Sequence, residues 1–245
     1  MHILNRDIEF IEEQRDCSYF DHEISDIRYK YMHSCTSEQY QAMLERGWRR
    51  FGKMHFVPEC RSCTKCVSMR IDVENYEFSR SEKRVINKNQ DTKLYIRPPS
   101  MTLEHLNLYD KYHAFMNDKK NWPYSPIEPN EYQKSYVEGK EEFAKEFLYM
   151  KDNKLIGVAL VDILPNSMSA IYCYYDHNYS DLSIGKFSIL AQIKIAKEMN
   201  IPYIYLGYWI KDHLSMGYKE AYTPFEVLKN RPNIDEITNW EKYEL

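Results

Sequence analysis

The spacing of apolar and polar residues changes several times along this chain, and each change predicts a new element. Short runs rich in aromatic and β-branched residues are typical of strands, and two of them flank Asp152-Asn153, a dipeptide that favours a hairpin turn. The predicted strands are Arg28–Met32, Arg70–Val73, Glu146–Lys151, Lys154–Ile163, Met168–Asp176 and Tyr203–Leu206, the last of which ends at Gly207. The run Leu4–Arg15 fits either a short strand or a helix.

Helical spacing is found between the early strands. Ser37 is the expected N-cap of a helix that ends at Gly47, and a second helix is expected to begin at Thr102. Its apolar stripe consists of Leu103, Leu106, Tyr109, Tyr112, His113 and Met116. We interpret the histidine in this stripe as a packed residue rather than as a base.

The second half of the chain adds two more helices. Three prolines make Asn121–Pro129 irregular, and a helix is expected to follow it as far as Gly139. A strongly amphipathic helix is expected to begin at Ser183 and to end near Asn200. Helices followed by antiparallel strands, a further helix and a last strand predict an α+β fold, in an order similar to that of GNAT-type acyltransferases.

The composition is that of an ordinary globular protein. The chain has 245 residues, of which 43% are hydrophobic and 29% charged, so it is long enough for one large or two small domains. No apolar run approaches the length of a membrane span, and acidic residues stand where a signal peptide would be basic and then apolar. Six cysteines without such a signal favour a reducing compartment, and we expect a cytoplasmic protein that does not enter a membrane.

The net charge of −4 hides an uneven distribution. Residues 45–97 contain thirteen lysines and arginines against seven acidic residues. Arg80, Lys83 and Arg84 in this stretch are spaced to share one helical face, where they could contact successive phosphates of RNA or form a solvated charged surface. The stretch ends near Arg97-Pro98-Pro99, and we place the boundary between two domains there, at residues 1–92 and 93–245.

Three cysteines of the first domain have the spacing of a metal knuckle. Cys60, Cys63 and Cys66 are separated by two residues each, which allows thiolates to bind one metal ion, and Cys17 is the candidate fourth ligand. Zinc or an iron–sulfur cluster would suit such a set. Reduced buried thiols or a redox-active pair would explain the same residues.

The residues Tyr205–Ile210, Met216, Tyr218-Lys219, Tyr222 and Pro224 form a specific pattern after the last predicted strand. In this pattern of residues the chain resembles the aminoacyl-tRNA–protein transferases, in particular the bacterial aspartate/glutamate leucyltransferases. The resemblance extends to Cys17, Tyr19 and the Arg28-Tyr29 pair near the N-terminus. It implies a GNAT-like domain for aminoacyl transfer, preceded by a smaller cysteine-containing α+β domain.

The resemblance also implies a reaction. Leucine would pass from leucyl-tRNA to the N-terminal Asp or Glu of a protein, which would create a destabilising N-terminus for degradation by the N-end rule pathway. Transfer needs no cofactor, because the aminoacyl ester is already activated and an α-amine with a pKa of about 7.7–8.0 is partly neutral in the cell. The partners are charged tRNA and proteins or peptides with an acidic N-terminus.

Within this reaction we assign roles to residues of the matching segments. Tyr175, Asp176 and Tyr208 are the candidates for positioning or deprotonating the amine and for the wall of the site. The candidate contacts to aminoacyl-tRNA are Ser183, Gly185, Trp209, Lys219 and Tyr222, together with Arg80, Lys83 and Arg84. An acidic acceptor needs a cation, for which Arg28, Arg49 and Arg50 are candidates.

Three alternatives remain open from the residues. An arginyl-tRNA donor shares the same C-terminal pattern. A coenzyme A-dependent acetyltransferase would share the fold, but the segment Asp181–Phe187 lacks the glycine spacing of a pyrophosphate loop. A metal- or redox-responsive RNA-binding module would account for the cysteines and the basic tract but not for the pattern at Tyr205–Pro224.

Overall fold

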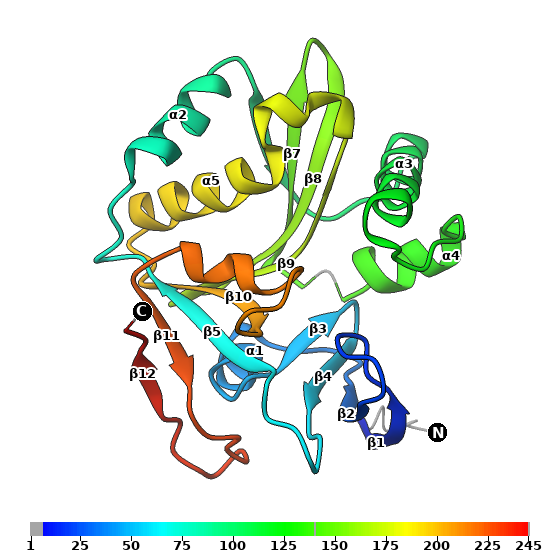
Figure 1. Cartoon of the computed structure of the whole chain (residues 1–245), viewed down its shortest axis with the longest axis vertical. Coiled ribbons are helices and arrows are strands. Elements are labelled where there is room, and N and C mark those ends of the chain that lie inside the picture. Colours follow the sequence, from blue (N-terminus) through cyan, green and yellow to red (C-terminus); the bar gives the residue numbers. More distant parts are fainter. Residues whose placement is uncertain (1–6, 140, 245) are drawn as a thin grey trace.

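The computed structural model describes residues 7–139 and 141–244, and they form a mixed α/β protein with two sheets (Figure 1). Within the predicted element Leu4–Arg15, residues 4–6 lie outside the described residues, and strand β1 (Ile8–Asp16) begins at Ile8. In the described ranges no helix has both the length and the apolar character needed to cross a membrane.

The larger sheet has eight strands in the order β12-β11-β5-β10-β9-β8-β7-β6. Their bounds are Val67–Asp72 for β5, Lys93–Arg97 for β6, Ala144–Lys151 for β7, Lys154–Ile163 for β8, Ser167–Tyr175 for β9, Tyr203–Trp209 for β10, Phe225–Leu228 for β11 and Trp240–Lys242 for β12. Strands β9 and β10 run parallel, because a helix connects them, and the other neighbours are antiparallel.

The smaller sheet has the order β1-β2-β4-β3 and is antiparallel throughout. Its other strands are β2 (Ile24–Tyr31), β3 (Arg49–Phe51) and β4 (Met54–Pro58), and helix α1 (Ser37–Glu45) lies between β2 and β3 in the chain. In Figure 1 this sheet lies at the lower right, below β7 and β8 and beside β5, and β3 contacts β9. The two sheets therefore meet beside the parallel pair.

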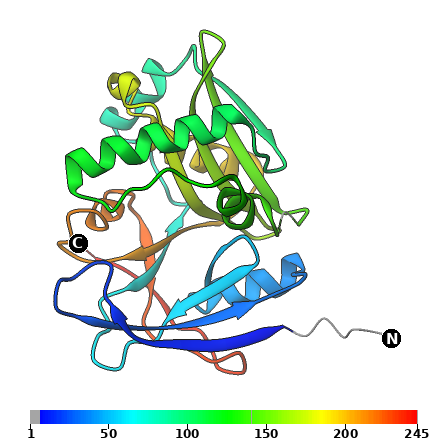
Figure 2. The same ribbon diagram turned by 90° about the vertical axis from the view of Figure 1, so that its right-hand side faces the viewer.

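Helices cover both faces of the larger sheet (Figures 1 and 2). Helix α5 (Ile184–Glu198) packs on β9 and β10, and α2 (Arg80–Lys88) packs on α5. On the opposite face α3 (Leu103–Lys120) crosses β8 and β9, and it is followed by α4 (Pro129–Tyr132) and the π-helix η1 (Gln133–Val137). Two short 3₁₀ helices, η2 (His177–Leu182) and η3 (Gly217–Ala221), follow β9 and β10.

The predicted hairpin at Asp152-Asn153 is confirmed. Both residues have positive φ, 50° and 58°, as a two-residue turn between twisted strands requires. The predicted end of the last strand at Gly207 is wrong. β10 continues to Trp209, because Gly207 adopts a φ of 81° and a bulge opposite Met69 lets pairing with β5 resume.

Two details of the predicted helices are also wrong. The N-cap of α1 is Thr36, whose hydroxyl accepts from the backbone N–H of Gln39 at 3.2 Å, so Ser37 is the first helical residue. The predicted apolar stripe of α3 is wrong only at its first member, because Leu103 is 77% exposed. Tyr112 and Met116 are buried as predicted, Leu106 and Tyr109 pack beside them, and His105 and Leu108 are buried as well.

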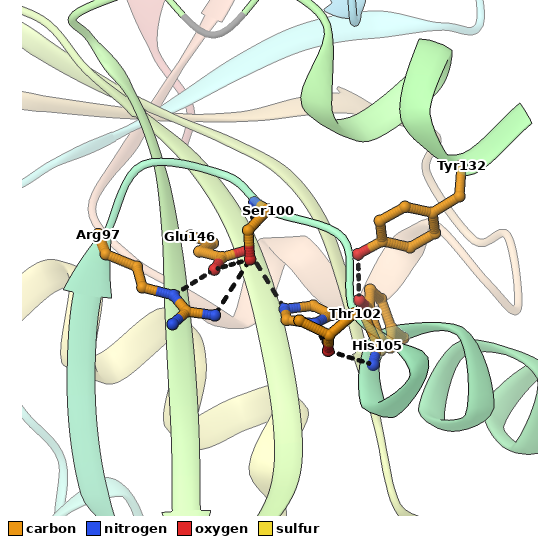
Figure 3. Close-up of polar contacts among 7 residues, drawn as sticks. Arg97, Ser100, Thr102, His105, Tyr132 and Glu146 are labelled. Atoms are coloured by element: carbon orange, nitrogen blue, oxygen red, sulfur yellow. Dashed lines mark hydrogen bonds and ion pairs between the residues drawn. The ribbon is translucent and has the colours of Figure 1, made fainter. Parts of the chain in front are cut away.

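A buried polar cluster fixes the start of α3 to the larger sheet (Figure 3). Glu146 on β7 is fully buried, and its carboxylate accepts from Arg97 Nε at 2.6 Å and from both the backbone N–H and the hydroxyl of Ser100 at 3.0 Å. Thr102 caps α3, and its hydroxyl lies 2.7 Å from Nδ1 of His105. The other ring nitrogen of this histidine lies 3.3 Å from Glu146, so the carboxylate joins β6, β7 and α3.

The predicted division at residue 92 stays a prediction. Strand β5, from the first of the two predicted domains, pairs with both β10 and β11 and contributes Met69 and Ile71 to the main core. Both side chains are completely buried. The chain on the two sides of residue 92 therefore shares one sheet and one hydrophobic core.

Candidate functional site

The parallel strands β9 and β10 pair only at their beginnings. Tyr203–Tyr205 pairs with Ser167–Ser169, and the described pairing between the two strands ends there. Beyond this point β9 stays bonded to β8, and β10 stays bonded to β5. We call this place the fork, and the two strands leave it toward η2 and η3.

Arg49 of β3 occupies the apex of the fork. Its Nη2 atom donates to the carbonyl of Ala170 at 2.6 Å and lies 3.5 Å from that of Tyr205, so it satisfies backbone groups just beyond the last strand pair. Gly207 lies against it, since a Cβ there would be in ordinary van der Waals contact with the guanidinium at 3.5 Å, and the φ of 81° is what favours glycine at this position. Arg49 is buried, and its Nη1 atom has no hydrogen-bond partner among the described residues.

The other two candidate arginines have carboxylate partners. Arg28 donates to Glu59 at 2.9 Å and to Glu9 at 3.2 Å. Arg50 forms a buried two-bond ion pair with Asp162. An acidic substrate would have to displace these carboxylates. Among the three, the geometry favours Arg49 as the cation that has binding capacity left.

Lys219 belongs to η3 and lies close to Arg49 and to the end of β10. Its side chain is 6% exposed, and Nζ donates to the carbonyl of Tyr208. Burial lowers the pKa of Lys219 to about 7, and the charge of Arg49 contributes to the shift. Much of this lysine is therefore neutral near pH 7, which weakens it as a permanent phosphate contact.

The aromatic residues predicted near the aminoacyl end are buried. The hydroxyl of Tyr208 donates to the carbonyl of Gly47 at 2.9 Å, and Trp209 packs edge-on against Phe225. Tyr222 is 3% exposed. These side chains support the end of β10 from inside, and their contact with a substrate stays a prediction.

Tyr175, at the end of β9, meets the start of α5. A Cβ built on Gly185 would lie 3.0 Å from the Tyr175 ring, so the glycine lets the strand end and the helix start approach closely. Ser183 precedes the helix in the left-handed region, with a φ of 52°, and is exposed. The structure thus brings together the predicted contacts Tyr175, Ser183 and Gly185.

Asp176 is held as a carboxylate. Its oxygens accept from Lys111 Nζ at 2.7 Å and from the backbone N–H of Asn178 at 2.9 Å. Burial raises its pKa, but the two hydrogen bonds and the lysine charge outweigh burial and leave the pKa below its ordinary value. This makes Asp176 a weak base and a suitable partner for a cation.

The four predicted metal ligands lie near one another. Burial, followed by the neighbouring thiols of Cys17, Cys60 and Cys63, raises the pKa of Cys66 to about 12. Among residues 7–139 and 141–244, however, no three His, Cys, Asp or Glu side chains are placed to hold a metal ion. The predicted zinc or iron–sulfur site therefore stays a prediction.

Helix α2 confirms that the predicted basic residues share one face. Arg80, Lys83, Arg84 and Lys88 are exposed, and in the described part of the chain none of them forms an ion pair. The acidic residue of the helix, Glu82, turns inward, caps the helix and accepts from Tyr76 at 2.7 Å. The exposed charges of the helix are therefore all positive.

The sequence did not indicate an aromatic cluster beside the fork. His113 on α3 lies 2.7 Å from the hydroxyl of Tyr172 on β9, and Tyr109 and Tyr136 stack around them. Helical spacing relates His113 to Tyr109, since they are four residues apart. No local pattern relates either residue to Tyr172, so this cluster becomes visible only once α3 is placed on the sheet.

Comparison with known proteins gives a consistent result along the chain. Residues 15–84 match the family model "Arginine-tRNA-protein transferase, N terminus", and residues 104–229 match the corresponding C-terminal model. A protein of Helicobacter hepaticus named aspartate/glutamate leucyltransferase is 47% identical over 236 residues, covering 96% of this chain and 98% of that protein. A protein of the same name from Campylobacter jejuni is 46% identical, covering 96% of this chain and 99% of its own length.

Among solved structures, a crystal structure of FemX superposes with a TM-score of 0.49 at 8% identity, covering 87% of this chain and 84% of that one. The family models and the curated relatives confirm the resemblance first seen at Tyr205–Pro224. The matched residues include Cys60, Cys63 and Cys66 as well as the fork. The chain belongs to the arginine-tRNA–protein transferase family, and it is similar over nearly its whole length to bacterial aspartate/glutamate leucyltransferases.

Proposed function

We propose that this protein transfers leucine from leucyl-tRNA to the N-terminal Asp or Glu of proteins and thereby marks them for the N-end rule pathway. The observation that carries the proposal is the similarity to proteins named aspartate/glutamate leucyltransferase, at 46–47% identity across 96% of the chain. The partners follow from that reaction: a charged tRNA as donor, and a protein or peptide with an acidic N-terminus as acceptor.

The chemistry is direct acyl transfer. The ester that joins leucine to the terminal ribose is activated, so the enzyme needs to position the acceptor amine, remove its proton and stabilise the oxyanion. No covalent intermediate with the protein is required. The cysteines and any metal bound to them take no part in the step that we propose.

We also propose that the larger sheet is a GNAT-like transfer domain. This proposal is supported by the parallel strands β9 and β10, which α5 connects. Their pairing ends at Tyr205, where the fork begins. The helix start at Ser183–Gly185 lies beside the end of β9, and the backbone N–H groups of Ile184 and Gly185 would be offered to the terminal phosphate. The smaller sheet, with the cysteines nearby, would complete the site from the β3 side.

Within this site the carboxylate of Asp176 and the ring of Tyr175 are the proposed contacts of the acceptor amine. Arg49 is the proposed partner of the acidic side chain, since it is the candidate arginine that has no carboxylate. Lys219 and Tyr222 remain proposed supports of the aminoacyl end. Tyr208 and Trp209 would form the wall behind it.

The donor and the acceptor can be tested together. We expect the purified protein, given leucyl-tRNA, to place leucine on peptides that begin with Asp or Glu and not on those that begin with Lys or Ala. Arginyl-tRNA is the control donor, because arginyl transfer is the alternative that the family name suggests. Arginine on the acidic peptides would keep the reaction and change the donor, and no transfer from either tRNA by folded protein would contradict the proposal.

The cationic face of α2 predicts where tRNA binds. Changing Arg80, Lys83 and Arg84 together to Gln should weaken leucyl-tRNA binding. Each positive charge that is lost reduces the number of counterions that binding releases from the tRNA phosphates. The slope of log Kd against log salt should fall by about 2–3. Filter binding of leucyl-tRNA at several salt concentrations measures both quantities.

A matched variant removes three exposed lysines outside α2, namely Lys119, Lys120 and Lys154, again as Gln. It has the same net charge as the α2 variant, so a general loss of attraction would affect both equally. We expect it to bind leucyl-tRNA almost as the unchanged protein does. Equal Kd values and salt slopes for the two variants would place the tRNA elsewhere.

A further inference from the structure

The contact between His113 and Tyr172 has a defined proton arrangement. The ring nitrogen Nδ1 of His113 lies 2.8 Å from the backbone carbonyl of Tyr109, which can only accept a hydrogen bond, so Nδ1 carries the hydrogen. Burial lowers the pKa of His113, and the ring is therefore neutral near pH 7. Its other nitrogen, Nε2, is then a free acceptor.

The phenol of Tyr172 donates a hydrogen bond to this nitrogen. Its oxygen lies 2.7 Å from Nε2, and burial raises the pKa of Tyr172, so the phenol is protonated and donates to the histidine. The oxygen keeps lone pairs that can accept one more hydrogen bond. Tyr172 is thus prepared to receive a proton on its oxygen while it passes its own proton to His113.

A bulge in the backbone of β9 sets the direction of the Tyr172 side chain. Pairing between β8 and β9 shifts register between Leu160 and Val161, which leaves Ile171 as an extra residue directly before Tyr172. Such bulges redirect side chains and are common next to active sites. Tyr172 is only three residues beyond Ser169, where the pairing of β9 with β10 ends. The phenol therefore lies beside the fork, on the face covered by α3.

The surroundings hold the pair in place but leave it partly accessible. Tyr136 of η1 stacks on Tyr172 with ring centroids 5.7 Å apart, and Phe51 of β3 meets it edge-on at 6.3 Å. His113 and Tyr172 are both of intermediate exposure. The titratable groups facing the histidine are the phenols of Tyr109, Tyr112 and Tyr172 and, on its own helix, the carboxylate of Asp110.

We infer that Tyr172 and His113 form the proton relay of the transfer reaction, with Tyr172 touching the acceptor amine. As the amine nitrogen forms its bond to the leucyl carbonyl carbon, its proton moves to the Tyr172 oxygen and the phenol proton moves to Nε2. The ester C–O bond then breaks, and the leaving ribose oxygen takes a proton back along the same path. Every proton and electron pair is accounted for, and no other reactant is needed.

This inference rests on the proposed leucyl transfer and assigns a step within it. The other polar groups around the fork are less suited to the role. Asp176 is committed to Lys111 and to Asn178, and the hydroxyl of Tyr208 is used by the carbonyl of Gly47. The amine could bind Asp176 and lose its proton to Tyr172, so the two assignments are compatible.

The test compares two variants that each lose one phenol oxygen. In Tyr172→Phe we expect the single-turnover rate constant of leucyl transfer to fall roughly 10²–10⁴-fold, the usual contribution of a positioned acid or base. Binding of leucyl-tRNA should not change. Tyr136→Phe is the control, because Tyr136 stacks on Tyr172 and loses a hydroxyl bonded to that of Tyr109 at 3.2 Å. It should transfer leucine almost as fast as the unchanged protein.

A second variant reports on His113, which acts through Tyr172 and is a positioning residue. At low pH the imidazolium can no longer accept a proton, so in the unchanged protein both the amine and the ring must be deprotonated. Burial puts the pKa of His113 below the ordinary histidine value of about 6.5, and below that lowered pKa log rate should rise with a slope near two per pH unit, against a slope near one in His113→Gln. A purely structural role would lower the rate without changing this slope.

The outcomes separate the two proposals. If the unchanged protein transfers no leucine, the proposed function fails. If it transfers leucine and Tyr172→Phe does so as fast as Tyr136→Phe, the relay is wrong while the function stands. The relay is also wrong if log rate rises with pH at the same slope in His113→Gln and in the unchanged protein at low pH. Melting curves of the three variants identify any loss that is due to unfolding.

Discussion

Replacing Asp162 by Asn should cost about 3–5 kcal/mol in the free energy of unfolding, because it leaves a buried guanidinium without its counter-charge. Asp162 is fully buried on β8, and Arg50 is 5% exposed. The arginine donates through Nε at 2.9 Å and through Nη2 to the two carboxylate oxygens. An amide has the same shape but neither the charge nor two acceptors.

The surroundings make this arginine hard to rehydrate. Its guanidinium lies 5.5 Å from the ring centre of Tyr40 and 5.3 Å from that of Phe143, and its remaining contact is the carbonyl of Gly52 at 2.8 Å. Urea unfolding at neutral pH measures the loss. The control is Glu241→Gln, which breaks the exposed pair with Lys229 and should cost less than about 1 kcal/mol.

A double variant tests the cause. In Arg50→Met with Asp162→Leu no charge remains buried, so much of the stability lost in Asp162→Asn should return. A double variant as unstable as the single one would indicate that packing, rather than the uncompensated charge, is responsible. Equal midpoints for Asp162→Asn and Glu241→Gln would contradict the expected effect altogether.

Glu146→Gln should be the second strongly destabilising change, with a loss of about 2–3 kcal/mol at neutral pH. The carboxylate has no exposed surface and accepts three hydrogen bonds, one from the Arg97 guanidinium and two from Ser100. An amide accepts through one oxygen only, and its NH₂ group would face donors. Because Arg97 is 47% exposed, solvent screens part of its contribution.

The same residue makes stability depend on pH. Burial raises the pKa of Glu146, but the neighbouring His105 imidazole, the Arg97 guanidinium and the backbone N–H of Ser100 outweigh burial and hold the pKa below the ordinary value. Its contribution is complete above the unfolded pKa of about 4.3 and is lost as pH falls through the folded pKa. Unfolding curves between pH 7 and 3 should therefore converge for Glu146→Gln and the unchanged protein. Glu104→Gln, on the exposed first turn of α3, is the control and should run parallel to the unchanged protein.

The sequence predicted those parts of the fold that depend on neighbours in the chain. The hairpin at Asp152-Asn153 follows from a local preference for positive φ, and the strands on both sides follow from short apolar runs. Thr36 and Ser37 are equally good caps by residue type, and only the hydrogen bond to Gln39 decides between them. The bulge at Gly207 needs β5 as a partner, which lies far away in the sequence.

The candidate site shows the same limit. The residues around Ser183 and Gly185 were found because they are adjacent in a recognisable pattern, and the structure places them beside Tyr175. The choice of Arg49 over Arg50 depends on Asp162, more than a hundred positions away. The relay needs a contact between positions 113 and 172 that no local periodicity encodes.

The position of β5 has a consequence for the order in which the protein can form. The strand is complete early in synthesis, but both of its partners, β10 and β11, leave the ribosome more than 130 residues later. Until then Met69 and Ile71 have no sheet to enter, and both edges of β5 are open to pairing with other chains. We therefore expect β5 to join the fold only after β10 and β11 have been made, and the nascent chain to be prone to pairing with other chains until then.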